Sequence, residues 1–116
     1  ERCRSTTFAV PILPGKTETW KQAITTLNGD RKVEFEEFNA RLGITRHVAS
    51  LQQTPQGDFA VVCIEGDDPD RVLGQMQQSD HPFDRWFVET IHQEVHGLDP
   101  SQAPPPPTTV FLDFKK

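Results

Sequence analysis

The chain is short of cysteine, and this shortage excludes one class of protein. Two cysteines in 116 residues are too few for a disulfide scaffold. Cys63 falls inside an apolar stretch, where a buried and unreactive thiol is expected. We therefore expect a protein of a reducing compartment, the cytoplasm.

Positive charge and long apolar runs are also scarce. Twelve Lys and Arg stand against 17 Asp and Glu, which gives a net charge of −5. A nucleic-acid surface needs clustered basic residues, and anionic membranes attract them, so we expect neither partner. No apolar run approaches the roughly 20 residues of a membrane span, and the polar start of the chain is not typical of a secretory signal.

The chain does have enough large apolar side chains for one hydrophobic core. Eight Phe and two Trp supply large side chains to bury, and 116 residues suit a single domain. We expect residues 1–5 to be a disordered N-terminus and residues 6–116 to form that domain.

The predicted strands are apolar on both faces. The clearest pair is a hairpin of 45–53 and 58–65, in which Pro55 and Gly57 suit a type I turn. One face carries His47, Ala49, Leu51, Ala60, Val62 and Ile64, and the other carries Val48, Ser50, Phe59, Val61 and Cys63. A sheet with one face in water alternates apolar and polar residues. The helices suffice for one face only, so we expect a second copy of the chain to cover the other.

The remaining elements complete a β-α-β-β-α-β order. Strands are predicted over 6–13 and 108–114, and helices over 18–42, from residue 69, and over 82–96. The first helix is expected to kink or break at residues 28–30. This order predicts an α+β fold: a four-stranded antiparallel sheet with helices on one face.

Three short motifs, together with this order, resemble the dimeric α/β-barrel superfamily, which has a ferredoxin-like fold. The motifs are Leu-Pro-Gly-Lys-Thr at 13–17, Leu-Gly-Ile at 42–44, and Ser-Asp-His-Pro-Phe-Asp-Arg-Trp-Phe at 79–87. The chain most resembles a poorly characterised bacterial subfamily and has a distant similarity to antibiotic-biosynthesis-type monooxygenases. The resemblance implies a homodimer joined through the free sheet faces, with a pocket between sheet and helices.

Haem-degrading members of that superfamily use an Asn on the first strand together with a Trp and a His. Trp86 and His96 match two of these positions, but the first strand here has no Asn. We therefore expect no cofactor. A haem-handling barrel with His96 or His47 as axial ligand is the weakest alternative.

Two histidines are candidate catalytic residues. His47 lies on the strand face expected to meet the helices, where an imidazole can act as acid or base. His81 lies in a polar segment between two helices, a position suited to the mouth of a pocket. The aromatic candidates for the pocket wall are Trp20, Phe83, Trp86 and Phe87.

His92 and His96 have the i, i+4 spacing of metal ligands on a helix, with Glu89 nearby. On an α-helix, at about 100° per residue, these side chains fall opposite Phe87. We therefore expect a solvated face there and no metal site.

The function stays open between two classes. The first is an uncharacterised small barrel protein that binds a small apolar ligand between sheet and helices. The alternative is a cofactor-independent monooxygenase or isomerase acting on an aromatic or polyketide-like substrate, with His47 or His81 moving the proton. Whether the chain is an enzyme is not decided by its sequence. An aromatic-lined pocket that contains one of these histidines would favour the enzyme, and a filled interior would favour a scaffold.

Overall fold

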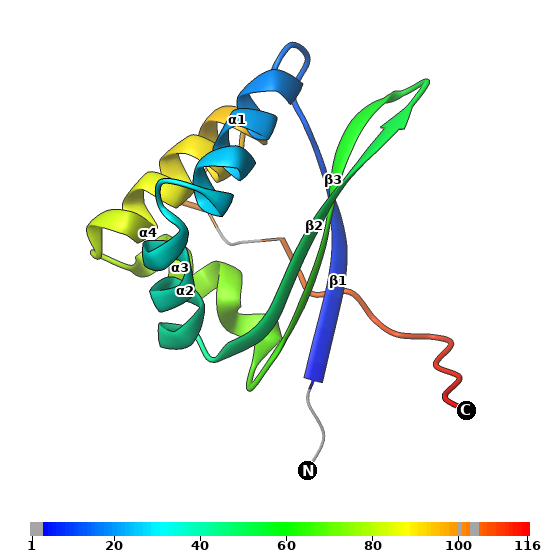
Figure 1. Ribbon diagram of the computed structural model, residues 1–116. Helices are drawn as coiled ribbons and strands as arrows, with labels where there is room; N and C mark the ends of the chain where they lie inside the picture. The colour runs from blue at the N-terminus through cyan, green and yellow to red at the C-terminus, as the bar shows by residue number, and fades with distance from the viewer. Residues whose placement is uncertain (1–3, 100, 103–104) are drawn as a thin grey trace.

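The computed structural model describes residues 4–99, 101–102 and 105–116 and has an α+β fold (Figure 1). Strands β1 (Arg4–Pro11), β2 (Ile44–Thr54) and β3 (Gly57–Gly66) form an antiparallel sheet in the order β1-β3-β2. The helical elements lie on one face of this sheet: α1 (Thr17–Asn28), α2 (Lys32–Arg41), the 3-10 turn η1 (Pro69–Arg71), α3 (Val72–Gln78), α4 (Pro82–Phe87) and the π-helical η2 (Val88–Val95). In this part of the chain, no helix has the length and apolar character needed to cross a membrane.

The predicted hairpin and its register are confirmed. Leu51 lies opposite Ala60, and His47 lies opposite Ile64, so the predicted helix-facing residues of β2 and β3 do share a face. The base of the hairpin requires glycine at Gly66, because a Cβ there would lie 2.2 Å from the carbonyl oxygen of Gly43. Strand pairing thus continues to the point where β2 begins.

The predicted break in the long helix is also confirmed. The backbone N–H groups of Gly29 and Arg31 both donate to the carbonyl oxygen of Thr26, which ends α1 and lets α2 start in a new direction. The expectation of a disordered N-terminus over residues 1–5 is wrong for Arg4 and Ser5 and stays a prediction for residues 1–3. Residues 1–3 lie outside the described residues, and Arg4 and Ser5 pair with β3 as the first residues of β1.

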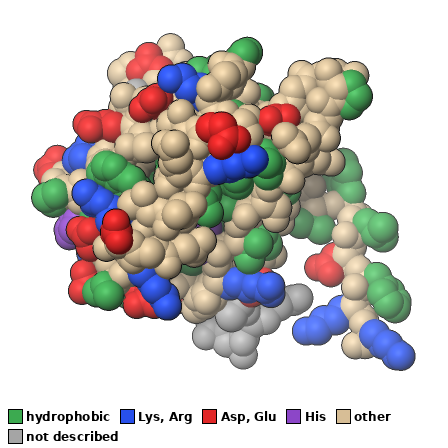
Figure 2. Space-filling view, turned by 45° about the horizontal axis from the view of Figure 1, so that its top comes forward, with side chains coloured by type: hydrophobic (Ala, Val, Ile, Leu, Met, Phe, Trp, Pro, Cys, Tyr) green, Lys and Arg blue, Asp and Glu red, His purple; other side chains and the backbone are tan. Residues whose placement is uncertain are grey.

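The prediction of a fourth strand over 108–114 is wrong. The described residues 105–116 contain no strand. The Thr108 hydroxyl donates to the carbonyl oxygen of Thr7 in β1 at 2.7 Å, and the tail then leaves the body of the protein (Figures 1 and 2). The four prolines at 104–107, just before Thr108, have no backbone N–H and cannot donate hydrogen bonds to a neighbouring strand. They therefore disfavour strand pairing where the chain reaches Thr108. The tail's apolar side chains, Val110, Phe111, Leu112 and Phe114, are 67–96% exposed.

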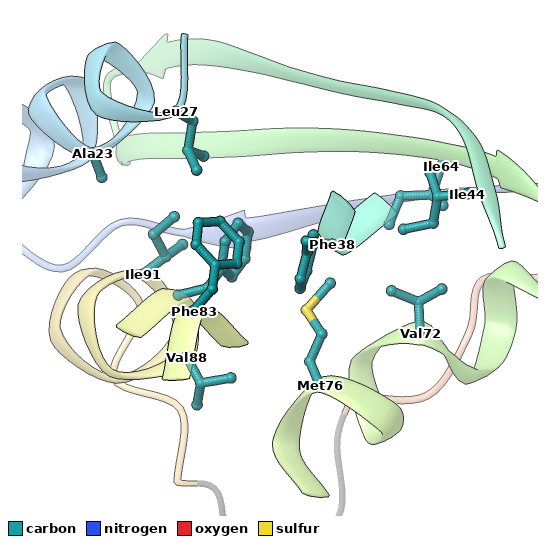
Figure 3. Packing of buried hydrophobic residues seen from close by; sticks show 11 residues of the cluster. Ala23, Leu27, Phe38, Ile44, Ile64, Val72, Met76, Phe83, Val88 and Ile91 are labelled. Carbon is teal, nitrogen blue, oxygen red and sulfur yellow. The ribbon is translucent and has the colours of Figure 1, made fainter. Parts of the chain in front are cut away.

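A layer of aromatic rings joins the helices beneath the sheet (Figure 3). Phe38 of α2 is fully buried, and its ring centroid lies 5.0 Å from that of Phe87 and 5.3 Å from that of Phe83, both in α4. Phe35, one turn before Phe38, stacks on it at 5.9 Å. These four residues form the aromatic layer and hold α2 against α4.

Truncation of Phe38 tests the importance of the aromatic layer. We expect Phe38→Ala to lower the free energy of unfolding by about 3–5 kcal/mol, because a fully buried ring leaves a cavity. Val33→Ala on the same helix, at a position 65% exposed, is the control and should change stability by less than about 0.5 kcal/mol. Denaturant titration measures both values, and equal losses would contradict this role.

Candidate functional site

A cavity of about 330 Å³ lies between the helices and the helix-facing side of the sheet. Small-molecule sites begin at roughly this size, about 300 Å³. Its wall is mostly apolar and includes the rings of Phe8, Trp20, Phe35 and Phe87. Three of the four histidines of the chain also line it: His47, His92 and His96.

His47 of β2 is held in one tautomer by Asn39 of α2. The amide nitrogen of Asn39 donates to the carbonyl oxygen of Phe35 at 3.0 Å, which leaves the amide oxygen to face His47 Nδ1, also at 3.0 Å. An amide oxygen only accepts, so Nδ1 carries the hydrogen and Nε2 keeps a free lone pair. Burial lowers the pKa of His47 from 6.5 to about 4. The ring is therefore neutral near pH 7.

The prediction that His92 and His96 belong to a solvated face is wrong. His92 is only 6% exposed and meets the ring of Phe87 edge-on, with centroids 5.6 Å apart. The predicted helix is α-helical only as far as Phe87. In η2 the N–H of His96 bonds to the carbonyl oxygen of Ile91, five residues back. A π-turn holds more residues than an α-turn, so position i+5 returns to the side of position i and His92 turns toward the cavity.

Burial lowers the pKa of all three cavity histidines. It is the largest cause that lowers the pKa of His92 from 6.5 to about 4, and the nearby imidazoles of His96 and His47 add to it. Burial also lowers the pKa of His96, partly offset by a hydrogen bond to the carbonyl oxygen of Pro11, 2.8 Å from Nδ1. Among the described residues, no group of three or more His, Cys, Asp or Glu is arranged to hold a metal ion.

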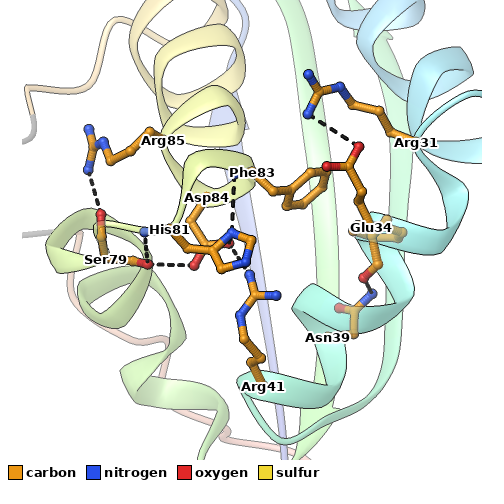
Figure 4. A network of polar contacts seen from close by, with 10 residues as sticks. Arg31, Glu34, Asn39, Arg41, Ser79, His81, Phe83, Asp84 and Arg85 are labelled. Atoms are coloured by element: carbon orange, nitrogen blue, oxygen red, sulfur yellow. Dashed lines mark hydrogen bonds and ion pairs between the residues drawn. The ribbon is translucent and has the colours of Figure 1, made fainter.

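The structure does not bring His81 to the cavity. Its Nδ1 accepts the backbone N–H of Phe83 at 3.2 Å and so caps α4. Next to it, the buried carboxylate of Asp84 pairs with Arg41 of α2 and accepts the Ser79 hydroxyl at 2.6 Å (Figure 4). This polar cluster ties the segment before α4 to α2. The catalytic roles of His47 and His81 stay predictions.

Only two of the four aromatic candidates line the cavity. Trp20 and Phe87 line the cavity, whereas Phe83 is buried in the aromatic layer. Trp86 is half-buried and does not line the cavity. The guanidinium of Arg31 lies 4.6 Å from the centre of the Trp86 ring.

Phe8, Phe35, Asn39 and His92 are among the residues of the site that sequence reasoning did not assign to it. Phe35 and Asn39 are four residues apart on one helix face, and this spacing was the signal available for them.

Comparison with known proteins supports the fold. No protein-family model matches the chain, and no curated protein matches it in sequence. A solved structure that matches is tetracenomycin F2 cyclase from Streptomyces glaucescens, a type-II polyketide cyclase. Its TM-score is 0.60 at 17% identity, over 97% of this chain and 98% of that one. At this identity, the likeness establishes a shared α+β fold.

Acid should destabilise the protein through these histidines. Between pH 4 and 6.5 the unfolded state binds more protons than the folded state, because the pKa values of His47 and His92 are lowered from 6.5 to about 4 on folding. The free energy of unfolding should therefore fall as the pH is lowered through this range, by on the order of 2–3 kcal/mol per histidine.

Denaturant titrations at a series of pH values measure this slope. His47→Gln should make the slope shallower, and Val33→Ala, at an exposed and uncharged position of α2, is the control that should leave it unchanged. Identical slopes in the parent protein and His47→Gln would contradict the neutral, buried state of His47.

Proposed function

We propose that the cavity binds a small, largely apolar molecule of the aromatic or polyketide-like class. The observation that carries this proposal is the composition of the wall, which combines aromatic and aliphatic side chains with three imidazoles. Apolar walls with a few well-placed polar groups are typical of small-molecule sites. The shared fold with a type-II polyketide cyclase supports the same class of ligand.

A second candidate function is proton transfer on that ligand, as in a cofactor-independent isomerisation or ring closure. His47 favours it, because Nε2 has a free lone pair while Nδ1 donates to the Asn39 amide oxygen. When Nε2 takes a proton, this hydrogen bond orients and stabilises the imidazolium that forms. His47 is then the general base, and Asn39 is a positioning residue.

We also propose that the protein is a homodimer whose second copy covers the far face of the sheet. The described helices all lie on the other side (Figure 1). On the far face, Val48, Phe59, Val61 and Cys63 are only partly buried in the single chain. The apolar side chains of the tail stand clear of the body as well (Figure 2). Exposed apolar side chains that lie side by side are typical of an interface.

Ligand binding can be measured through Trp20, which lines the cavity. In a Trp86→Phe background Trp20 is the only tryptophan, and we expect anthraquinone to quench its fluorescence saturably. Val62→Phe places a larger side chain in the cavity wall and should weaken binding by about tenfold or more. Val33→Phe, exposed on α2, is the matched control. Absence of saturable quenching, or unchanged affinity in Val62→Phe, would refute the proposal.

Assembly can be tested on the far face. We expect light scattering to show a dimer at micromolar concentration, and Val61→Asp to weaken association by roughly 3–5 kcal/mol, because it buries an unpaired charge. Val33→Asp makes the same chemical change on an exposed helix surface and should leave the dimer intact. A parent protein that stays monomeric at tens of micromolar would rule the dimer out.

A further inference from the structure

His92 differs from the other cavity histidines in its hydrogen bonding. Its Nδ1 is buried without a partner, the one such side-chain nitrogen or oxygen in the part of the chain that the structure describes. By contrast, Nδ1 lies 3.0 Å from the Asn39 amide oxygen in His47 and 2.8 Å from the Pro11 carbonyl oxygen in His96. Those two rings carry their hydrogen on Nδ1 and leave Nε2 bare.

The unpartnered nitrogen determines the tautomer of His92. Buried N–H groups without an acceptor are rarer than buried acceptors without a donor. Burial and two neighbouring imidazoles also disfavour the charged ring, whose pKa falls to about 4. Nδ1 of His92 is therefore bare, and the hydrogen is on Nε2. The cavity wall thus contains one imidazole with an N–H donor and two with acceptor nitrogens.

Aromatic contacts place this donor and the His47 acceptor at the two ends of one row of rings. His47 packs on Phe35 with centroids 5.4 Å apart. Phe35 stacks on Phe87 at 6.4 Å and 4° between planes, and Phe87 meets His92 edge-on at 5.6 Å. All four rings line the same cavity. His47 and His92 therefore lie at opposite ends of one row of rings in the wall of the cavity.

We propose that His92 Nε2–H donates a hydrogen bond to a ketone oxygen of the ligand, so that the site selects oxygenated aromatic molecules over hydrocarbons of the same shape. The inference rests on the proposed ligand class and deepens it. A hydrocarbon in the cavity would leave the buried N–H unpaired, whereas a ketone satisfies it. The π-helical turn serves this role, because an α-helix would carry His92 away from the cavity.

The donor also completes the proton-transfer chemistry. His47 Nε2 removes a proton from the carbon next to the ketone, and the C–H electron pair forms a C=C bond. The C=O π pair moves to the oxygen, where His92 Nε2–H stabilises the negative charge. In a ketone that already has a C=C bond between its β and γ carbons, return of the proton from His47 to the γ carbon restores the C=O and moves the C=C bond to the α,β position, and no electron is gained or lost. His92 is thus a catalytic residue that contacts the substrate oxygen.

The tautomer can be measured on the unmodified protein. Long-range proton–nitrogen NMR correlations distinguish a bare from a protonated ring nitrogen in each histidine. Near neutral pH we expect His92 to carry its hydrogen on Nε2, and His47 and His96 to carry theirs on Nδ1. A His92 ring with its hydrogen on Nδ1 would overturn the assignment, whether or not any ligand binds.

Selectivity for the ketone can be measured with two ligands of the same three-ring shape, anthraquinone and anthracene. In the Trp86→Phe background, His92→Phe should lower the affinity for anthraquinone about tenfold and leave that for anthracene unchanged. Glu89→Phe, at an exposed position of η2 outside the cavity, is the control and should affect neither.

The outcomes separate the two proposals. If neither ligand binds the Trp86→Phe protein, the proposed ligand class is wrong, and the tautomer measurement alone decides the assignment of the donor. If His92→Phe changes the affinity for both ligands equally, or for neither, the ligand class stands and the role of His92 is overturned.

Discussion

The contact between α2 and α4 is the constraint on which the rest of the structure depends. The aromatic layer forms it, with the ring centroids of Phe38 and Phe87 5.0 Å apart, and the ion pair between the buried Asp84 and the exposed Arg41 adds a polar contact at its edge. The layer has two roles, because Phe38 and Phe83 fill the core while Phe35 and Phe87 form part of the cavity wall. Packing that stabilises the fold therefore also sets the separation of His47 and His92.

Local sequence patterns were enough to predict those elements whose geometry is set by residues close together in the chain. The two-residue loop at Pro55 and Gln56 and the alternation of β2 and β3 gave the hairpin register, since a slip by one residue would reverse every side chain. The break near Gly29 followed in the same way. The prediction of a fourth strand failed because strand pairing depends on residues far away in the sequence. The alternation in 108–114 shows which side chains are apolar, but not which part of the protein they pack against.

Only part of the candidate site could be predicted from the sequence. His47 could be placed because a strand has a fixed period of two. Its partner Asn39 could not, since that contact depends on how α2 packs against β2. His92 was misplaced for a different reason: the helical period itself changes after Phe87, and no residue type in η2 signals the change. The error therefore fell on a cavity residue, where departures from local rules are common.

The tail links the two proposed properties of the protein. Pro105 is part of the cavity wall, and three residues later the Thr108 hydroxyl is bonded to the edge of β1. The exposed apolar residues follow immediately. Under the proposed dimer, a partner that covers those residues also restrains Pro105 and therefore one side of the cavity. Ligand binding and dimer formation are then coupled through this segment. Each process restrains the segment, so the conformational entropy lost in one no longer has to be lost in the other.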